Sequence, residues 1–219
     1  MISTIKFDSF HQREEIKREL NFIKLEHEIM KDFVDFEIFS FDELDEYQIG
    51  YSIDLNGNSL VTDEADTWDD SWVVIGYETL CGDPIIIELN EAGYPVSRLM
   101  HGMGSWNNGT FLADSIKSFL SILKDIRCFL TEKQMLQGKK MIQHKELKVL
   151  VNSMIEKNKT VDFEIWEALL QPLFDMAEEY EETLKAKIEE MKREGRKITE
   201  IAGMLSIQPK DVYEYSKKS

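Results

Sequence analysis

The sequence has few of the residues that mark several common classes of protein. Its two cysteines, Cys81 and Cys128, are too few for a disulfide scaffold and fit a reducing, cytoplasmic location. Four prolines and 11 glycines among 219 residues exclude a collagen-like or low-complexity chain. No apolar run approaches the ~18–20 residues of a membrane span, and the N-terminus lacks the pattern of a secretory signal. We therefore expect a globular cytoplasmic protein without a membrane partner.

Positive charge is missing from one long stretch. Residues 32–97 contain no Lys or Arg but carry 17 acidic residues. Residues 1–130 hold 10 basic and 25 acidic residues, whereas residues 131–219 hold 16 and 17, so the formal net charge of −16 lies almost entirely in the first part. An acidic surface repels phosphates, which makes nucleic acid an unlikely main partner. The simplest interpretation is a solvated face, but an anion-only surface repels itself. We therefore interpret it as a surface that attracts a basic protein.

The first 130 residues alternate between helical and strand-like patterns. Helical spacing predicts an amphipathic helix over residues 9–33, with Ser9 as its cap. Helical spacing returns over residues 111–130. An Asn56-Gly57 pair between two of the strand-like segments is a strong hairpin signal, and short turns between consecutive strands imply an antiparallel meander. The predicted strands cover residues 47–55, 59–62, 71–77, 84–89 and 95–99.

The rest of the chain is expected to be helical. One candidate helix covers residues 131–157, interrupted at Gly138, and another covers residues 160–194, broken or kinked at Pro172. The composition changes near residue 131, where we place a domain boundary. The expected architecture is α+β: a mostly antiparallel sheet flanked by helices over residues 1–130, followed by an all-helical extension over residues 131–219 that ends in a helix-turn-helix-like hairpin.

A series of short motifs runs between Phe39 and Leu123. The motifs are Ile75-Gly76, Gly82-Asp83, Glu88-Leu89, Pro95-Val96, Trp106, and a helix with Ala113, Ser115, Phe119 and Leu120. Their order resembles the SUKH superfamily, which includes yeast cell-wall synthesis regulators and many bacterial immunity proteins. The likeness covers about 85 of the 219 residues, and the family's usual helix before the sheet has no counterpart here. The resemblance implies an α+β fold and, in bacteria, a protein that neutralises a toxin by binding it.

An acidic loop, residues 63–70, is the candidate binding site. No apolar periodicity requires Trp68 in the core, and acidic residues surround it on both sides. Tryptophan is over-represented among interface hot spots, and charges around it set specificity and association rate. The simpler interpretation is that Trp68 fills an edge of the core, as we expect for Trp72 and Phe119. The predicted partner-binding residues are Glu64, Asp66, Trp68, Asp69, Asp70, Glu78 and Asp83.

Neither catalysis nor metal binding is expected. The four histidines are far apart, and no H-x-x-x-H or C-x-x-C spacing predicts a zinc site. A calcium loop starting at Asp63 fails because Trp68 and Val74 stand where Gly and Glu are required. His101 and Ser105 invite comparison with a catalytic loop, but the G-x-S-x-G elbow and the phosphate-loop fingerprints are missing. We expect no enzyme, no metal and no cofactor.

The tail has the spacing of a helix-turn-helix over residues 195–216, with Ala202 at a close helix crossing and Ser206-Ile207 at the turn. The positions expected to face inward are Ile198, Ile201, Leu205, Val212 and Tyr215. The second helix mixes Lys210 with acidic neighbours, which suits phosphates poorly. We therefore favour a helical hairpin that does not bind DNA. If it did bind DNA, the contacts would come from Arg196, Lys197, Lys210 and Tyr213.

Three hypotheses about function follow. The leading one is a cytoplasmic immunity protein whose acidic surface binds and neutralises a cognate basic toxin domain, for example a nuclease. The second is a DNA-associated regulator that uses the C-terminal hairpin. The third is a non-catalytic scaffold that forms a homo-oligomer through its C-terminal helices.

Overall fold

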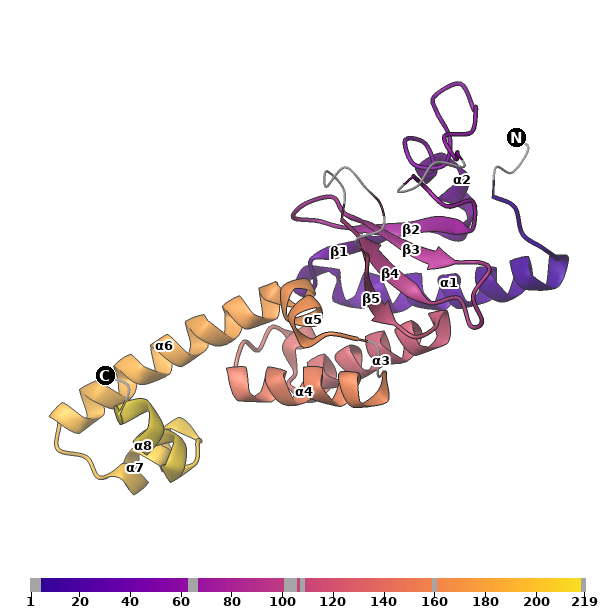
Figure 1. The fold of residues 1–219 in the computed structure, drawn as a ribbon. Helices are drawn as coiled ribbons and strands as arrows, with labels where there is room; N and C mark the ends of the chain where they lie inside the picture. Colours follow the sequence, from indigo (N-terminus) through magenta and orange to yellow (C-terminus); the bar gives the residue numbers. More distant parts are fainter. Residues whose placement is uncertain (1–4, 63–66, 101–105, 107–108, 159–160, 218–219) are drawn as a thin grey trace.

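The computed structural model describes residues 5–62, 67–100, 106, 109–158 and 161–217. The chain folds as an α+β protein around a five-stranded antiparallel sheet, in which each strand pairs with its neighbour in sequence (Figure 1). This confirms the predicted fold class and the antiparallel meander. The strands are β1 (Phe36–Ile38), β2 (Trp72–Glu78), β3 (Pro84–Glu88), β4 (Val96–Leu99) and β5 (Gly109–Ala113).

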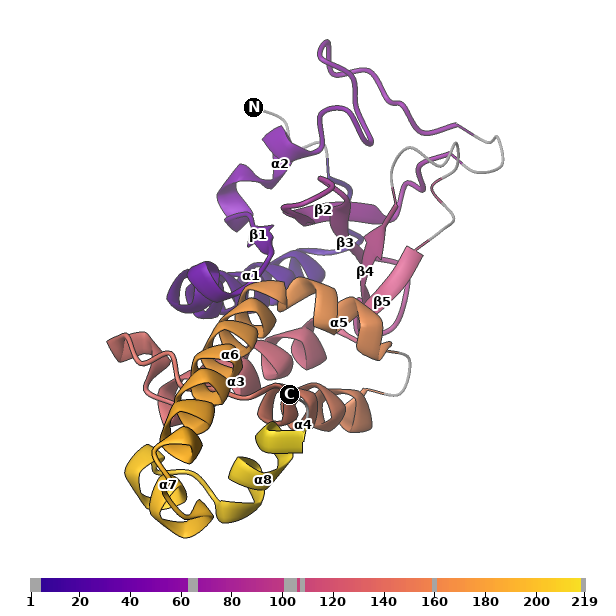
Figure 2. The same cartoon turned by 90° about the vertical axis from the view of Figure 1, so that its left-hand side faces the viewer.

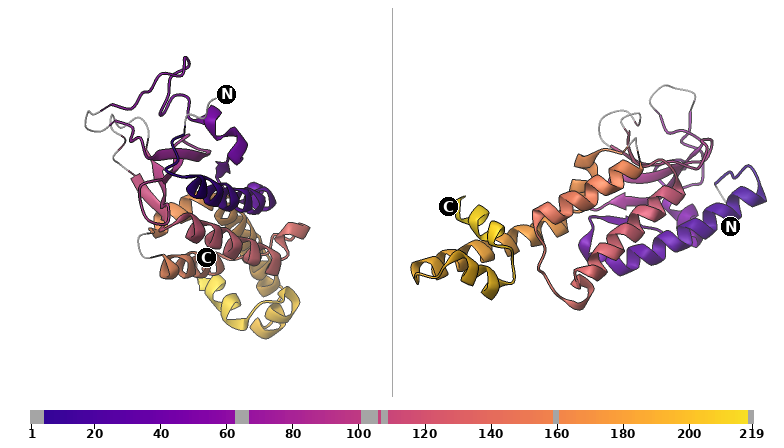
Figure 3. Two further views of the ribbon diagram at one scale, coloured as in Figure 1. Left: turned by 90° about the vertical axis from the view of Figure 1, so that its right-hand side faces the viewer. Right: turned by 90° about the horizontal axis from the view of Figure 1, so that it is seen from below.

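Two helices, α1 (Phe10–Met30) and α3 (Ile116–Glu132), cover one face of this sheet. Ser9 caps α1 by accepting a hydrogen bond from the Gln12 amide at 3.1 Å, as the sequence predicts. Seen from below, the two helices lie side by side (Figure 3, right). Ion pairs at both ends of the contact, Lys117–Glu15 at 2.6 Å and Arg127–Glu26 at 2.5 Å, show that they run parallel.

The predicted strands over residues 47–55 and 59–62 are wrong. The chain forms η2 (Phe41–Glu43), α2 (Leu44–Tyr47) and then a series of turns with only isolated bridges. The buried side chain of Gln48 explains the difference, because its amide bonds both the N–H and the C=O of Val74 at 3.0 Å and so occupies groups that a neighbouring strand would use. The turn at Asn56-Gly57 does form, with Gly57 at a φ of 81°.

The prediction also missed two strands. β1 has only three residues, and its apolar segment showed no alternation long enough to detect. β5 covers residues that we assigned to the start of a helix at residue 111. The helix α3 begins at Ile116, because Ser115 caps it by accepting a hydrogen bond from the Ser118 amide at 3.0 Å. Three apolar residues in a row, Phe111, Leu112 and Ala113, fit the spacing of a helix or of a strand equally well. The Ser115 cap was therefore the better signal for where the helix begins.

The C-terminal part is helical, as expected. A short helical turn, η1 (Lys31–Phe33), ends α1, and another, η3 (Met135–Gln137), precedes Gly138, whose φ is 86°. The predicted interruption at Gly138 is therefore correct. A break before Pro172 separates α5 from α6, and this proline stands in the first turn of the second helix, where its missing N–H costs nothing. The longer helices are α4 (His144–Lys157), α5 (Phe163–Leu169), α6 (Gln171–Arg193), α7 (Ile198–Leu205) and α8 (Pro209–Lys217).

The molecule has a large core and a small one. Apolar side chains on both sides of residue 131 share the large core, which extends from Ile16 to Ala177. Trp166 joins the two parts: it is fully buried, donates its indole N–H to the Leu112 carbonyl at 3.1 Å, and meets Phe36 edge-on. The domain boundary at residue 131 stays a prediction. No helix in the described ranges is long and apolar enough to cross a membrane.

The small core lies at the far end of α6, where α7 and α8 fold back against the helix (Figure 2). Its buried members come from these three helices alone: Leu184, Ile188, Ile201, Ala202, Val212 and Tyr215.

Candidate partner-binding surface

The sheet has a second face, turned away from α1 and α3, which we call the open sheet face. Because side chains alternate along a strand, the strand register places one set of residues on it. Trp72 lies opposite Glu88, and Ile86 lies opposite Val74 on one side and Ser97 on the other. α2 lies above this face and covers only part of it (Figure 1).

The first hollow on the open sheet face has a volume of about 190 Å³. The Trp72 indole N–H donates to the Glu88 carboxylate at 3.4 Å, so one carboxylate is held at the hollow by a neutral partner. Phe111 is 41% exposed at its rim. The hollow thus offers aromatic and apolar walls with a single negative charge. Its lining residues are Trp72, Ile86, Glu88, Ser97, Leu99, Trp106, Gly109 and Phe111.

The second hollow, of about 290 Å³, lies between α2 and β2. Tyr47 stacks flat on Phe39 with ring centroids 3.5 Å apart, and the Tyr47 side chain stays 41% exposed. Glu46, also exposed, is the one carboxylate among the lining residues. Among the described residues that line the two hollows, there is no Lys or Arg. The hollow is lined by Phe39, Glu46, Tyr47, Ile49, Tyr51, Val74, Gly76, Tyr77 and Gly82.

A cluster of aromatic rings joins the two hollows, and Trp68 lies at its centre. Trp68 packs edge-on against Trp72 and Trp106, with ring centroids 5.5 and 5.1 Å apart, and at a tilt against Tyr51 at 5.1 Å. It is only 2% exposed, so the prediction of an exposed interface tryptophan is wrong. The simpler interpretation, packing at an edge of the core, fits this burial. Burial raises the pKa of Tyr51, and Asp83 adds to the effect, so the hydroxyl stays protonated at neutral pH.

Two of the predicted partner-binding acids are buried parts of the fold. The Glu78 carboxylate accepts hydrogen bonds from the amides of Leu80 and Cys81, at 2.6 and 2.9 Å, and so closes the turn between β2 and β3. Asp83 lies 3.8 Å from the Arg98 guanidinium. Both side chains are at most 6% exposed, so their prediction as surface contacts is wrong. A tight turn needs such caps, and no charge pattern in the sequence distinguishes a cap from a surface contact.

Of the other four predicted acids, two are exposed and two lie outside the described ranges. Asp69 and Asp70 are exposed. Asp69 accepts hydrogen bonds from the amide and hydroxyl of Ser71, and Asp70 pairs with Lys6 at 2.9 Å. Glu64 and Asp66 lie outside the described residues, as do His101 and Ser105.

The acidic stretch does have counter-ions, although the sequence suggested none. Basic residues from before and after the stretch approach three of its acids: Lys6 lies beside Asp70, Lys17 lies 3.5 Å from Asp42, and Arg98 lies beside Asp83. Residues 32–97 therefore do not form one continuous anionic surface. Among the described acids, Glu46 and Glu88 are the ones that line the two hollows.

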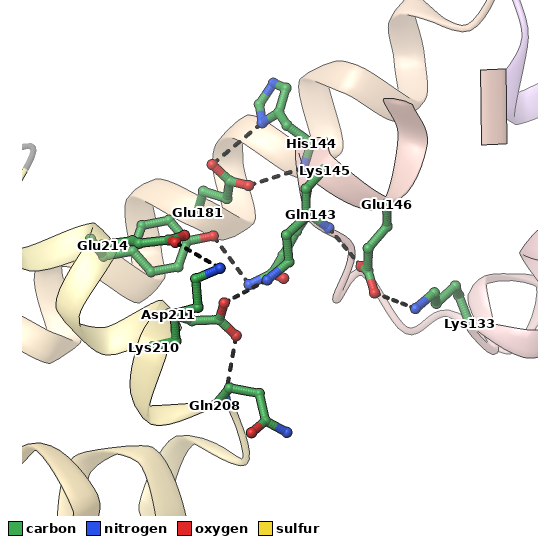
Figure 4. A network of polar contacts seen from close by, with 11 residues as sticks. Lys133, Gln143, His144, Lys145, Glu146, Glu181, Gln208, Lys210, Asp211 and Glu214 are labelled. Carbon is green, nitrogen blue, oxygen red and sulfur yellow. Dashed lines mark hydrogen bonds and ion pairs between the residues drawn. The ribbon is translucent and has the colours of Figure 1, made fainter. Parts of the chain in front are cut away.

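Polar contacts fasten the C-terminal hairpin to α4 and α6 (Figure 4). Lys145 pairs with the buried Asp211 of α8 at 2.5 Å, and the Gln143 amide donates to the Tyr215 hydroxyl at 3.1 Å. Glu181 of α6 accepts from the His144 backbone amide at 2.9 Å. Asp211 and Tyr215 of α8 therefore add polar contacts to the apolar packing of Val212 in the small core.

The hairpin has the predicted shape. Ser206, at the turn, takes a φ of 54°, and Ile201 and Ala202 are buried where α7 crosses its neighbours. Ile198 is 41% exposed, so its inward placement was wrong: it is the first residue of α7 and lies beyond the contact with α8.

The basic residues proposed for DNA contact have acidic neighbours close to them in the sequence. Arg196 donates to Glu194 at 2.9 Å, and Lys210 lies 3.6 Å from Glu214. The Lys197 backbone amide donates to Glu200 at 3.0 Å. Tyr213 is 51% exposed, with Lys217 above its ring. The side-chain charges of Arg196 and Lys210 are thus partly neutralised where a phosphate would bind.

The structure offers little for metal chemistry in the part of the chain that it describes, where no group of three or more His, Cys, Asp or Glu residues could hold a metal ion. Comparisons of the chain with protein-family models, with curated proteins and with solved structures found no match. Any functional interpretation of the open sheet face therefore rests on its geometry. Sequence reasoning assigned Trp72 to the core, and its side chain does pack against the large core while it also lines the first hollow. Strand alternation, which places Trp72 and Val73 on opposite faces of the sheet, was the signal that could have indicated this second contact.

Proposed function

We propose that the protein is a cytoplasmic binding protein of the immunity type, which docks a basic toxin domain on its open sheet face. One observation carries the proposal: two neighbouring hollows with aromatic walls each hold a carboxylate, Glu88 in one and Glu46 in the other, and have no basic residue in their linings. The resemblance of residues 39–123 to the SUKH superfamily favours the same function.

A lysine or arginine of the partner fits such a hollow chemically. Its charge would pair with the Glu88 or Glu46 carboxylate, while its aliphatic part and cationic head contact aromatic faces such as that of Trp72. The net charge of −16 adds long-range attraction that speeds encounter with a basic protein. Neutralisation follows when the docked protein covers the toxin's substrate site.

The test is co-purification with the basic toxin domain encoded by the neighbouring gene, followed by association kinetics at several salt concentrations. Reversing both charges, with Glu46→Lys and Glu88→Lys, should slow association and flatten its salt dependence. Glu189→Lys, an exposed position on α6, makes the same kind of charge change far from the sheet and is the matched control. Equal kinetics for the wild-type protein and both variants would place the docking surface elsewhere, and no complex at all would remove the proposal.

The DNA-associated regulator is a second candidate, because α7 and α8 have the turn geometry of a helix-turn-helix. A gel-shift measurement with the full-length protein at low salt separates the two candidates. Retardation that Arg196→Ala and Lys197→Ala weaken together would favour DNA binding. No retardation at micromolar protein would remove it.

A further inference from the structure

A stripe of exposed apolar residues runs along the outer side of α1. Phe22, Leu25 and Ile29 are 48%, 62% and 46% exposed, whereas Ile16, on the inner side of the same helix, is fully buried. Three large apolar side chains in one row are more than the scattered exposure that surfaces normally show. Seen from below, α1 lies at the surface beside α3 (Figure 3, right).

The stripe continues into charged residues of opposite sign. Arg18 lies one turn before Phe22, and Asp32, in the short helical turn η1 that follows α1, lies three residues after Ile29, so the spacing of the row is 18, 22, 25, 29, 32. Steps of four and three residues average 3.5, the period at which two helices stay in contact along a seam. Arg18 is 60% exposed at its side chain, and Asp32 is also exposed.

This arrangement is self-complementary. A two-fold axis through Leu25 brings an antiparallel copy of α1 onto the stripe, with Leu25 against its own counterpart. The same axis places Phe22 against Ile29 of the other copy and Arg18 against Asp32. A surface whose two halves match under a two-fold rotation is what an isologous dimer requires. Glu28, beside the stripe, is already neutralised by Lys24 at 2.7 Å and Lys31 at 3.5 Å.

We propose that a second copy of this chain docks on the stripe formed by Arg18, Phe22, Leu25, Ile29 and Asp32, with the two α1 helices antiparallel. The charge pattern favours this occupant, because a basic partner would meet Arg18 and an acidic one would meet Asp32. The C-terminal helices are less suited to self-association, since their apolar residues, such as Ile188 and Val212, are buried in their own small core.

The dimer leaves the open sheet face free. α1 lies on the other side of the sheet, so each copy can still dock a partner, and the proposal does not rest on the proposed function. The stripe spans about 21 Å of helix at ~1.5 Å per residue. A contact of this length is at the small end of specific interfaces, so the expected dissociation constant is micromolar.

Sedimentation equilibrium of the full-length protein over about 1–100 µM tests the proposal. The wild-type protein should change from monomer to dimer within this range. Leu25→Glu should weaken the dimer about a hundredfold or more, because each copy loses a buried leucine and two carboxylates meet at the axis. Leu55→Glu is the matched control: Leu55 is 88% exposed and far from α1, and its substitution should leave the dimer unchanged.

A charge exchange tests the antiparallel arrangement. Asp32→Arg should weaken the dimer about tenfold, because two attractive exposed pairs become repulsive. Adding Arg18→Glu to the same variant should restore it. Since Arg18 also pairs with Glu19 at 2.7 Å, the melting temperature of each variant is measured alongside.

A crosslink gives a readout that does not depend on affinity. With Cys81 and Cys128 replaced by serine, Leu25→Cys should form a disulfide with its counterpart under mild oxidation, since the two residues meet at the axis. Leu55→Cys in the same background should not. A wild-type protein that stays monomeric throughout, or a dimer that survives Leu25→Glu, would overturn the proposal and assign the stripe to a different protein or to none.

Discussion

The two faces of one sheet differ although the same strands build both. On the side covered by α1 and α3, Ile75, Ile85 and Ile87 are fully buried. On the other side the alternate positions hold Trp72, Glu88 and Phe111, which stay partly exposed around a hollow. Burial dictates the residues of the first face, because only apolar side chains of fitting shape are stable there. On the second face Val74 and Ile86 are buried as well, but the positions of Trp72, Glu88 and Phe111 are free of that demand, which is why polar and charged side chains are tolerated there.

The largest expected effect is a loss of packing behind the covered face. Phe119 is fully buried and contacts both Phe36 and Trp166. Phe119→Ala should lower the free energy of unfolding by about 3–5 kcal/mol. Phe111→Ala, the same change on the open sheet face, should cost about 1 kcal/mol or less, since the ring is 41% exposed. Urea denaturation measures both, and equal losses would contradict the distinction between the faces.

The next effect is steric and concerns the edge of the sheet. A Cβ at Gly76 would lie 2.1 Å from the Glu37 carbonyl oxygen, so Gly76→Ala must push β1 away from β2. We expect a loss of about 1–3 kcal/mol. Gly203→Ala, in α7 with no atom within 4 Å of the new Cβ, should instead stabilise its helix by up to about 1 kcal/mol. Thermal denaturation distinguishes a loss from a gain.

A buried histidine behind the covered face should make stability depend on pH. His27 lies between α1 and β1, fully buried, with its Nε2 atom 2.8 Å from the Phe36 carbonyl. Burial lowers the pKa of His27, more than the Phe36 carbonyl and Glu37 raise it. The unfolded chain therefore binds this proton more readily, and the stability that the neutral ring contributes is lost as the pH falls below about 6.5.

His27→Gln tests this expectation. Its unfolding free energy, measured between about pH 7.5 and pH 5.5, should fall less steeply with acidification than that of the wild-type protein. Parallel curves would mean that another group governs the acid response.

The smallest effect has the opposite sign and lies where β1 meets α6. Burial raises the pKa of Asp35, and the nearby carboxylates of Glu78 and Asp175 add to the rise. The folded protein therefore binds this proton more readily than the unfolded chain, so the group gains stability as the pH falls. Asp35→Asn should be slightly more stable than wild type at pH 7, by less than about 1 kcal/mol, and the difference should disappear in acid. A melting-temperature series against pH measures it.

Much of the fold could be predicted from local signals. Ser9 marked the start of α1, and apolar segments with turn residues between them placed β2, β3 and β4 to within a residue or two. These elements were predictable because the cap, the periodicity and the turns agreed. The segment after Tyr47 failed because its alternating residues do not form a ladder. A single buried amide, that of Gln48, fills the place of a strand, and no sequence pattern announces such a contact.

The candidate surface was harder to predict than the fold. A charge count over residues 32–97 cannot show that Lys6, Lys17 and Arg98 come back to meet three of its acids. It also cannot separate exposed acids from Glu78, which caps a turn. Burial of Trp68 depends on three other aromatic rings brought from distant parts of the chain. Contacts between residues distant in sequence decided the ion pairs and the burial of Trp68, whereas the role of Glu78 was decided by a local turn.

The two cores also set an order of events during synthesis. Every side chain of the large core precedes residue 178, whereas the small core needs residues as late as Tyr215. At ~5–20 residues per second, a ribosome that has released the first half of α6 has supplied the nascent chain with all that the sheet and its helices require. We therefore expect the C-terminal hairpin to pack against a sheet and helices that have already folded, so that its polar contacts with α4 form last.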